Sequence, residues 1–338
     1  MLSLTNASIK SFVYQNPSFT TPEKSMFSYQ GYSLNIHSDF PLPELLPGGD
    51  ETDIYIQKGK LKPPSLEPTS INRQGIEALF GGTTQEAYLH WQGIATLLAK
   101  DGTTLIVEPD SDDIEPQLLN LYILSEALGI ILYQRGLFLL HASAIKIGEQ
   151  VVIFAGTPGA GKSTIAAAFA QCGYTVLADD MVAMSLDSAG KAMVYPGFPQ
   201  IKIWPSAVKG LGYNPSSLPS LFSGSRKRVI QQKENFPVDP FPLAHIFFLE
   251  DGANLKFTKM AKTEAFFSLA RFFPLPSDLL QGTALERHFQ QCVQFTRDVD
   301  IWKVENPKNF EALKSLVRWV EGELGENRAK DKVFCSIS

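Results

Sequence analysis

One stretch of the sequence constrains the fold more than any other: at 151–164 an apolar run breaks into glycines and then into Lys-Ser-Thr. Gly156, Gly161, Lys162 and Ser163 occupy the fixed positions of the pattern G-x-x-x-x-G-K-[ST]. In such a pattern the glycines let backbone N–H groups converge on phosphate oxygens, the lysine reaches the β- and γ-phosphates, and the serine ligates Mg²⁺. The stretch therefore predicts a strand, a phosphate-binding loop and a helix.

The predicted ligands are ATP and Mg²⁺. The predicted nucleotide-binding residues are Gly156, Thr157, Pro158, Gly159, Ala160, Gly161, Lys162, Ser163 and Thr164. An alanine-rich segment, 164–172, follows as the predicted helix and ends at Gly173. The alternative is a glycine turn without a ligand. A dinucleotide-binding fold is excluded, because no G-x-G-x-x-G begins at the end of the strand.

The bulk composition indicates a globular, cytoplasmic protein. The 338 residues are 44% hydrophobic, and a net charge of -5 gives no electrostatic reason to expect nucleic acid or an anionic membrane as a partner. Cys172, Cys292 and Cys335 lie far apart and match neither a disulfide framework nor a metal site. The first residues lack a signal-peptide pattern, and the apolar run near 130–140 is interrupted by polar residues. The composition does not determine the oligomeric state.

The chain divides into four predicted parts. Residues 1–26 are rich in Ser, Thr and Asn and predict a loose arm, and the polar residues 326–338 predict a flexible tail. Residues 27–112 predict a small antiparallel β-rich module, with proline and glycine turns between short alternating runs at 31–36, 53–57, 88–91 and 104–107. Residues 113–325 form the domain that carries the phosphate loop.

Within this domain, the hydrophobic period predicts a mixed sheet with flanking helices. Predicted helices cover 115–133, 262–273, 284–295 and 309–324, and predicted strands cover 137–145, 243–249 and 301–304. The turn at Gly148 pairs the strand 137–145 with the phosphate-loop strand. Residues 191–242 are rich in proline and predict a long irregular loop or lid.

Two carboxylates and one imidazole are predicted to lie near the phosphates. Asp179 and Asp180 end an apolar strand that leads towards the loop, and His141 lies one strand away. Burying two adjacent carboxylates costs free energy unless a cation or a hydrogen-bond donor lies beside them. In a phosphate-loop protein Mg²⁺ or the hydroxyl of an acceptor can take that place. A solvated Asp-Asp turn and a structural buried histidine are the alternatives. Arg226, Lys227 and Arg228 are candidates for binding a phosphate or an acidic peptide. A run of charges that only contacts solvent is an equally weighted alternative.

The order His141-Ala-Ser-Ala, then 156–164, then 173–182 resembles the HPr kinase/phosphorylase-related kinases. The match covers roughly 130–185. Looser similarity at Trp204-Pro205 and 226–228 looks closest to the branch found with lasso-peptide biosynthesis. The resemblance implies a phosphate-loop kinase core of HPr kinase type. It also implies an ATP-dependent, Mg²⁺-assisted transfer of the γ-phosphoryl group to a serine of a peptide or protein.

On the matching positions, the resemblance makes Asp179 the base and Asp180, with Ser163, a metal contact, although the two aspartates could exchange roles. His141 and Lys162 complete the predicted catalytic set. The glycine-rich signature of the phosphorylase reaction is not found in this chain, so the reverse reaction is not predicted. Two alternatives stay open: a small-molecule hydroxyl kinase, and a nucleotide-binding ATPase or switch without an acceptor.

Overall fold

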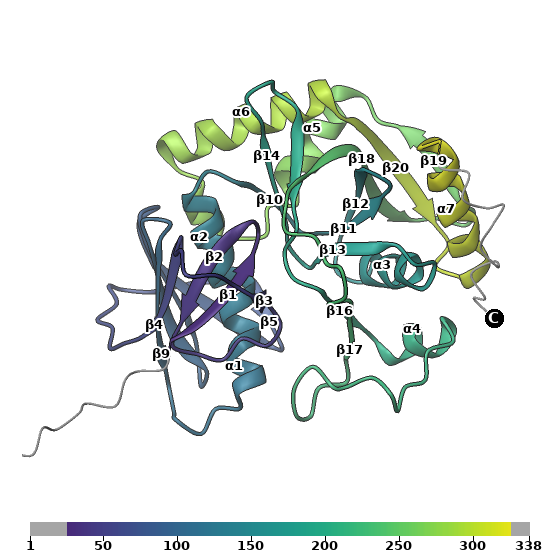
Figure 1. Ribbon diagram of the computed structural model, residues 1–338. Helices are drawn as coiled ribbons and strands as arrows, with labels where there is room; N and C mark the ends of the chain where they lie inside the picture. The colour runs from purple at the N-terminus through teal and green to yellow at the C-terminus, as the bar shows by residue number, and fades with distance from the viewer. Residues whose placement is uncertain (1–25, 326–338) are drawn as a thin grey trace, which may run out of the picture.

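The computed structural model describes residues 26–325, so the predicted arm before residue 26 and the predicted tail at 326–338 lie outside this range. Two large sheets and the helices that cover them make up the described chain (Figure 1). This mixed α/β arrangement matches the predicted order of a β-rich module followed by a mixed sheet with flanking helices. The assignment of the second part as a kinase core stays a prediction.

The first sheet contains nine strands in the order β3-β1-β2-β4-β9-β8-β7-β6-β5. The strands are β1 (Phe27–Gly31), β2 (Leu34–Ser38), β3 (Leu46–Pro47), β4 (Ile54–Lys58), β5 (Glu67–Arg73), β6 (Ile76–Gly82), β7 (Glu86–Trp91), β8 (Ala95–Lys100) and β9 (Thr104–Pro109). Strand β4 runs parallel to both β2 and β9. The module is predicted to be antiparallel, and the other pairings of this sheet are antiparallel; at β4 the chain crosses over instead of reversing.

The run at 31–36, which its alternation predicts to be one strand, contains a hairpin turn. Strand β1 ends at Gly31 and β2 begins at Leu34, while Tyr32 and Ser33 have φ values of 56° and 57°. Two successive residues with positive φ are typical of the tight turns that join antiparallel strands. Apolar and polar positions continue to alternate through a two-residue turn, so this pattern does not show where the chain reverses.

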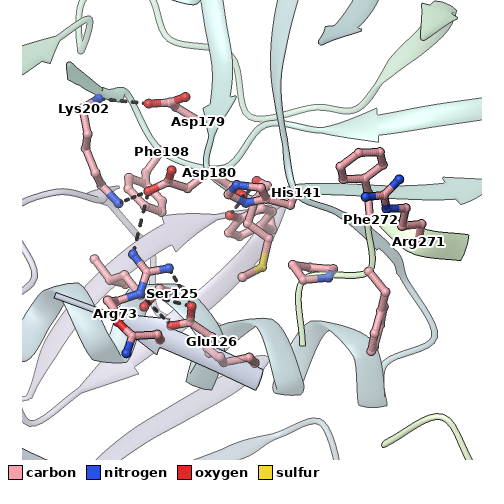
Figure 2. A pocket seen from close by; sticks show the side chains of 17 residues that line it. Arg73, Ser125, Glu126, His141, Asp179, Asp180, Phe198, Lys202, Arg271 and Phe272 are labelled. Carbon is pink, nitrogen blue, oxygen red and sulfur yellow. Dashed lines mark hydrogen bonds and ion pairs between the residues drawn. The ribbon is translucent and has the colours of Figure 1, made fainter. Parts of the chain in front are cut away.

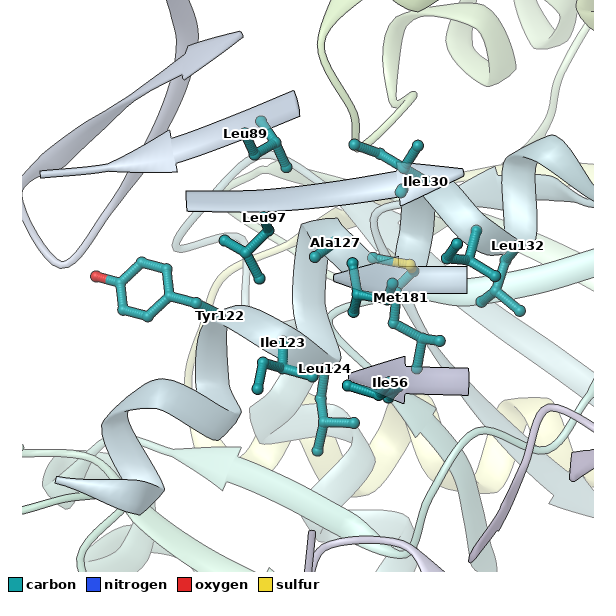
Figure 3. Close-up of a cluster of buried hydrophobic side chains, with 14 of the residues drawn as sticks. Ile56, Leu89, Leu97, Tyr122, Ile123, Leu124, Ala127, Ile130, Leu132 and Met181 are labelled. Carbon is teal, nitrogen blue, oxygen red and sulfur yellow. The ribbon is translucent and has the colours of Figure 1, made fainter. Parts of the chain in front are cut away.

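One helical segment covers the first sheet. It consists of α1 (Pro116–Tyr122), the π-helical turn η1 (Ile123–Ala127) and α2 (Leu128–Gln134). Its side chains and those of the sheet form one buried hydrophobic cluster, part of which Figure 3 shows. The sheet and this helix together form the first module (residues 27–134). The predicted boundary at 112/113 instead assigns the helix to the second part, and where the domains divide stays a prediction.

The same helical segment is long and apolar enough to cross a membrane. Its mean hydropathy over an 18-residue window is 1.2, but 83% of that window is buried inside the fold. A buried core helix of a globular protein has the same length and composition as a membrane span. The packing of this segment on the first sheet therefore accounts for its apolar character.

The second module (residues 138–325) is built on a sheet in the order β10-β14-β15-β18-β12-β11-β13, with β20 beside β18 and β19 beside β20. The strands are β10 (Phe138–Leu140), β11 (Ala142–Ile147), β12 (Gln150–Gly156), β13 (Thr175–Asp179), β14 (Val182–Leu186), β15 (Ala192–Tyr195), β18 (Phe241–Asp251), β19 (Lys256–Lys259) and β20 (Asp300–Asn306). The single strand predicted at 137–145 is divided at His141. Strand β10 pairs with β14, whereas β11 pairs with β12 and β13.

Helices cover both faces of this sheet. They are α3 (Lys162–Gln171), α5 (Lys262–Arg271), the short η2 (Ser277–Leu279), α6 (Gly282–Asp298) and α7 (Phe310–Glu323). Val152 and Phe154 of β12 lie in a cluster with α3 and α7, whereas Val151, Ile153 and Ala155 lie in the cluster with α5 and α6. A strand buried on both faces reads as a continuous apolar run, which explains the sequence before the loop.

The segment 191–242 is more ordered than its composition predicts. Besides β15 it contains β16 (Gln200–Ile203), α4 (Pro205–Gly210) and β17 (Arg228–Gln231), and β16 and β17 pair as a two-stranded sheet. The prediction of a wholly irregular loop is therefore wrong. Its prolines lie mainly between these elements or at the first position of α4, where a proline costs no helical hydrogen bond.

The packing of α4 on α7 leads to a stability prediction. A Cβ atom at Gly210 would lie 1.7 Å from Cζ of Phe310, whereas one at Gly322 would have no neighbour within 4 Å. We expect Gly210→Ala to lower the free energy of unfolding by about 1–3 kcal/mol, because the ring must move. Gly322→Ala, the matched control inside α7, should raise it by up to about 1 kcal/mol. Urea unfolding of both variants measures this. Equal effects would contradict the packing described.

Candidate active site

The loop at 157–161 joins the carboxyl end of β12 to the amino end of α3. Gly161 precedes the helix with a φ of 103°, a left-handed conformation that glycine adopts without steric cost. The first turn of α3 carries backbone N–H groups without helical partners, and such groups form an anion site at a helix N-terminus. A Cβ at Gly156 would lie 3.1 Å from the carbonyl oxygen of Leu249, so the loop begins where β12 meets β18 closely.

Lys162 is folded back over this loop. Its Nζ donates to the carbonyl oxygens of Gly156, at 2.8 Å, and Thr157, at 3.2 Å. Burial lowers the pKa of the lysine, and the two aspartates oppose that shift. The ammonium group is therefore held at the loop by carbonyls that a phosphate could replace.

Asp179 is the last residue of β13 and is buried among hydrogen-bond donors. The hydroxyls of Ser143 and Ser163 donate to its Oδ1 at 2.7 and 2.9 Å, and the backbone N–H of Lys202 donates to its Oδ2 at 3.0 Å. Burial and the neighbouring Asp180 raise the pKa of this carboxyl above its ordinary value. The loop serine and the strand-end aspartate, which sequence reasoning expects to converge, are thus in direct contact.

Asp180 turns the chain between β13 and β14 with a φ of 80°, an uncommon conformation for a residue with a side chain. Its Oδ2 lies 3.1 Å from Nζ of Lys202 and 4.0 Å from a terminal nitrogen of Arg73 (Figure 2). Burial alone would raise its pKa, but Lys202, Arg73 and Lys227 hold the pKa well below the ordinary range. Asp180 is therefore a fixed negative charge at neutral pH.

His141 lies at the break between β10 and β11. Its Nδ1–H donates to the backbone carbonyl of Asp180 at 2.9 Å, and its backbone N–H donates to the carbonyl of Phe272 at 3.0 Å. Burial and the charge of Lys162 lower the pKa of the imidazole, so the ring is neutral at pH 7. A neutral ring that donates from Nδ1 presents an unprotonated Nε2. The histidine thus holds the backbone of the aspartate pair rather than its carboxylates.

Sequence reasoning did not identify Lys202, Arg73 and Glu126. Lys202 belongs to β16, and its side chain is only 6% exposed. Arg73 belongs to β5 of the first module and forms a two-pronged bond with Glu126, with contacts of 2.6 and 2.9 Å. One signal was available: Glu126 is the single charged residue within Pro116–Gln134. Nothing in the sequence places Arg73 near residues more than a hundred positions away.

The three predicted basic residues are not brought together. Arg226 is exposed, and Arg228 donates to the hydroxyl of Ser220. Lys227 lies 5.4 Å from the ring centre of Trp204, and its charge acts on both Asp180 and Lys162. Only Lys227 therefore contributes to the electrostatics of the site.

Two hollows adjoin these residues. The inter-module cavity, of about 260 Å³, lies between the modules, and the aspartate pair, His141 and Lys202 line it together with Arg73 (Figure 2). The loop-side hollow, of about 310 Å³, is lined by Thr157 and Pro158 of the loop, residues 248–251 and Lys308. Arg271 and Phe272 line both. The site thus has one hollow beside the glycine-rich loop and another beside the carboxylates.

No all-protein metal cage exists within residues 26–325, where no group of three or more His, Cys, Asp or Glu side chains could hold an ion. Mg²⁺ is commonly bound by one or two carboxylates together with substrate phosphates and water. The hydroxyl of Ser163 is an oxygen ligand that such an ion could use, and it lies 2.9 Å from the carboxylate of Asp179. The residues present therefore fit a magnesium ion that arrives with a nucleotide.

No protein-family model matches the chain, and no curated protein matches it. Among solved structures, the Hpr(Ser) kinase/phosphatase from Coxiella burnetii aligns with a TM-score of 0.29 and 13% identity, over 57% of this chain and 99% of that chain. A similarity this distant does not establish family membership. The sequence resemblance to HPr kinase-related kinases, and to their lasso-peptide branch, stays a prediction.

The buried pair of Lys202 and Asp180 leads to a pH-dependent prediction. Lys202→Met leaves the carboxylate without its closest cation, and we expect a loss of about 3 kcal/mol in unfolding free energy at pH 7. The depressed pKa of Asp180 means that its contribution to stability is present above the ordinary value of 3.8 and is lost as the pH falls through the folded value. In the variant the pKa of Asp180 is higher, so this carboxylate should become protonated at a higher pH than in the wild type. The loss of unfolding free energy caused by Lys202→Met should therefore become smaller as the pH is lowered.

Denaturant unfolding of wild type and variant between pH 4 and 8 measures this effect. The matched control is Lys303→Met, whose partner Glu264 lies 3.4 Å away with both side chains partly exposed, and it should cost no more than about 1 kcal/mol. A loss for Lys202→Met that is small, or that does not depend on pH, would contradict the electrostatic role of this pair.

Proposed function

We propose that the protein is an ATP-dependent, Mg²⁺-assisted kinase that transfers the γ-phosphoryl group to a hydroxyl. One observation carries this proposal: the serine that follows the loop lysine donates directly to Asp179, at the end of the neighbouring strand. This contact brings a buried carboxylate next to the loop that we propose binds phosphate. A glycine turn without a ligand has no need of such a carboxylate, since burying its charge costs free energy.

The loop and the start of α3 would bind the nucleotide. Phosphate oxygens would accept from the backbone N–H groups at 159–163, and Lys162 would exchange its carbonyl partners for the β- and γ-phosphates. When bound through Ser163, Mg²⁺ would neutralise charge on the phosphates. Because phosphoryl transfer passes through a loose transition state, positioning and charge supply most of the rate enhancement.

We propose that Asp179 accepts the proton of the acceptor hydroxyl. Its raised pKa supports this role, as does its place beside the inter-module cavity. A role of Asp180 as a metal ligand has less support, because Lys202 and Arg73 already compensate the charge of its carboxylate. We therefore propose that Asp180 fixes these two cations and, through its backbone carbonyl, His141.

The acceptor is proposed to be a serine of a peptide or protein. A small hydroxylated molecule is the second candidate, and the size of the inter-module cavity favours it: about 260 Å³ lies just below the ~300–1,000 Å³ of sites that bind drug-sized ligands. A switch or ATPase without an acceptor has less support, because the cavity lies directly beside the carboxylates. Both kinase candidates use the same catalytic residues.

The test is incubation with ATP and Mg²⁺ and a panel of serine-containing peptides and small hydroxyl compounds, followed by mass spectrometry. Gain of one phosphate on an acceptor supports the kinase, and the identity of the acceptor separates the two candidates. Release of ADP without any phosphorylated acceptor would favour the switch. Lys162→Ala should abolish transfer and weaken nucleotide binding.

Asp179→Asn tests the proposed base. The amide cannot accept the proton, so we expect kcat to fall by about 10²- to 10⁴-fold while ATP binding changes little. Asp278→Asn, at an exposed position outside both hollows, is the matched control and should retain activity. Steady-state kinetics and a nucleotide-binding titration measure the two effects. Near-normal transfer by Asp179→Asn would show that Asp179 is not the base.

A further inference from the structure

Arg271 is the last residue of α5 and lies where the two hollows meet. Its side chain lines the loop-side hollow together with Thr157 and Pro158. It also lines the inter-module cavity together with Asp179 and Asp180. Arg271 is therefore a cation that borders both the hollow beside the glycine-rich loop and the cavity beside the aspartates.

Three other cations at the site already have polar partners, and Lys227 lies over the ring of Trp204. Lys202 binds Asp180, Arg73 binds Glu126, and Lys162 donates to loop carbonyls. Arg271 forms no ion pair with any residue between 26 and 325; its guanidinium lies 5.8 Å from the ring centre of Phe272. An exposed guanidinium without a carboxylate partner retains its donors for a ligand, and a guanidinium binds phosphate oxygens in a two-pronged way.

The backbone beside Arg271 is fixed to the catalytic sheet. The carbonyl oxygen of the next residue, Phe272, accepts a hydrogen bond from the backbone N–H of His141 at 3.0 Å. The ring of Phe272 stacks on the ring of Phe248 in β18, with the ring centroids 5.4 Å apart. Ala265 and Leu269, earlier in α5, are buried against the same sheet. The arginine thus extends from a rigid base, as a group that stabilises a transition state requires.

We infer that Arg271 binds the phosphoryl group during its transfer, and that the inter-module cavity is the acceptor site; this inference rests on the proposed kinase function. In the step, the bond between the γ-phosphorus and the bridging oxygen of ADP breaks. The acceptor oxygen forms the new bond to phosphorus, and its proton passes to Asp179. Arg271 offsets the negative charge on the three oxygens of the group in transit.

The first module supplies one wall of this acceptor site. Asn72 and Arg73 of β5 line the cavity, together with Ser125 and Glu126 of the π-helical turn. Ser125 has a φ of -98° and a ψ of -111°, outside the helical region. Short π-helical turns inside α-helices are frequent at functional sites. The acceptor is accordingly a small polar compound with a hydroxyl group, or one serine residue of a peptide, and side chains of both modules contact it.

The first experiment needs no acceptor. It compares binding of Mg²⁺-ADP alone with binding of Mg²⁺-ADP plus aluminium fluoride, which mimics the phosphoryl group in transit, by isothermal titration calorimetry. We expect Arg271→Gln to weaken the aluminium fluoride complex by about 10²-fold or more and to change the ADP affinity by less than about threefold. Arg297→Gln, on the exposed face of α6 and outside both hollows, is the matched control and should change neither.

If Arg271→Gln weakens binding of both ligands equally, Arg271 is an ordinary nucleotide contact. If it weakens binding of neither, Arg271 takes no part in the reaction. Both outcomes overturn the inference. Failure of the wild-type protein to bind ADP would instead contradict the proposed function. The two failures are therefore distinguishable.

The second experiment tests the acceptor site with two probes, free L-serine and a short peptide with one central serine. Asn72→Trp places an indole at the cavity wall, whereas Glu77→Trp places one at the position paired with Asn72 in the sheet, outside the cavity. We expect Asn72→Trp to raise the acceptor KM at least tenfold with unchanged ADP binding, and Glu77→Trp to leave the KM unchanged.

Phosphorylation of free serine alone identifies a small acceptor, and phosphorylation of the peptide alone identifies a peptide acceptor; both agree with the cavity. The same acceptor KM in the two tryptophan variants would place the acceptor elsewhere and overturn this part of the inference. If the wild-type protein phosphorylates neither probe, the cavity is not an acceptor site for a serine hydroxyl and this part of the inference is overturned, while the aluminium fluoride measurement separately decides the role of Arg271.

Discussion

Two adjacent carboxylates buried at the end of one strand are the constraint on which the rest of the site depends. Isolated buried charges are too costly to persist, so each carboxylate must have its own compensation. Asp179 obtains it from two serine hydroxyls and a backbone N–H, and Asp180 obtains it from Lys202 and Arg73. The different partners separate the pKa values of the two groups, and such separation within a pair is typical of sites for proton transfer.

This compensation also explains why the modules meet where they do. Arg73 comes from the first module, is held by Glu126 of the helix that covers the first sheet, and lies beside Asp180 of the second. This polar contact therefore links the two modules at the site itself, in addition to the apolar side chains of the second module that pack into the cluster of the first. The inter-module cavity is what remains between the fixed walls, so the first module has a role in the site as well as in the fold.

The sequence predicted the local elements of the second module well. The strand before the loop, the helix after it and the carboxylates at the next strand end follow from hydrophobic period and motif spacing, and the structure has them. It predicted less of the first module, where the hairpin at Tyr32 and Ser33 could not be distinguished from a strand and four strands, β3, β5, β6 and β8, were not predicted. It also did not show the division of the strand at His141, because both halves are equally apolar.

By itself, the sequence determined the phosphate-loop pattern, the apolar strands of a sheet covered on both faces, and the presence of two acidic residues beside the loop. These features are local, and backbone chemistry and side-chain periodicity over a few residues encode them. Only the tertiary structure decided that Lys202, Arg73 and Glu126 surround the aspartates, that Arg226 and Arg228 do not, and that Arg271 lies between two hollows. The reason is physical: long-range charge compensation depends on which distant segments the packing of two modules brings together, and no spacing along the chain records that.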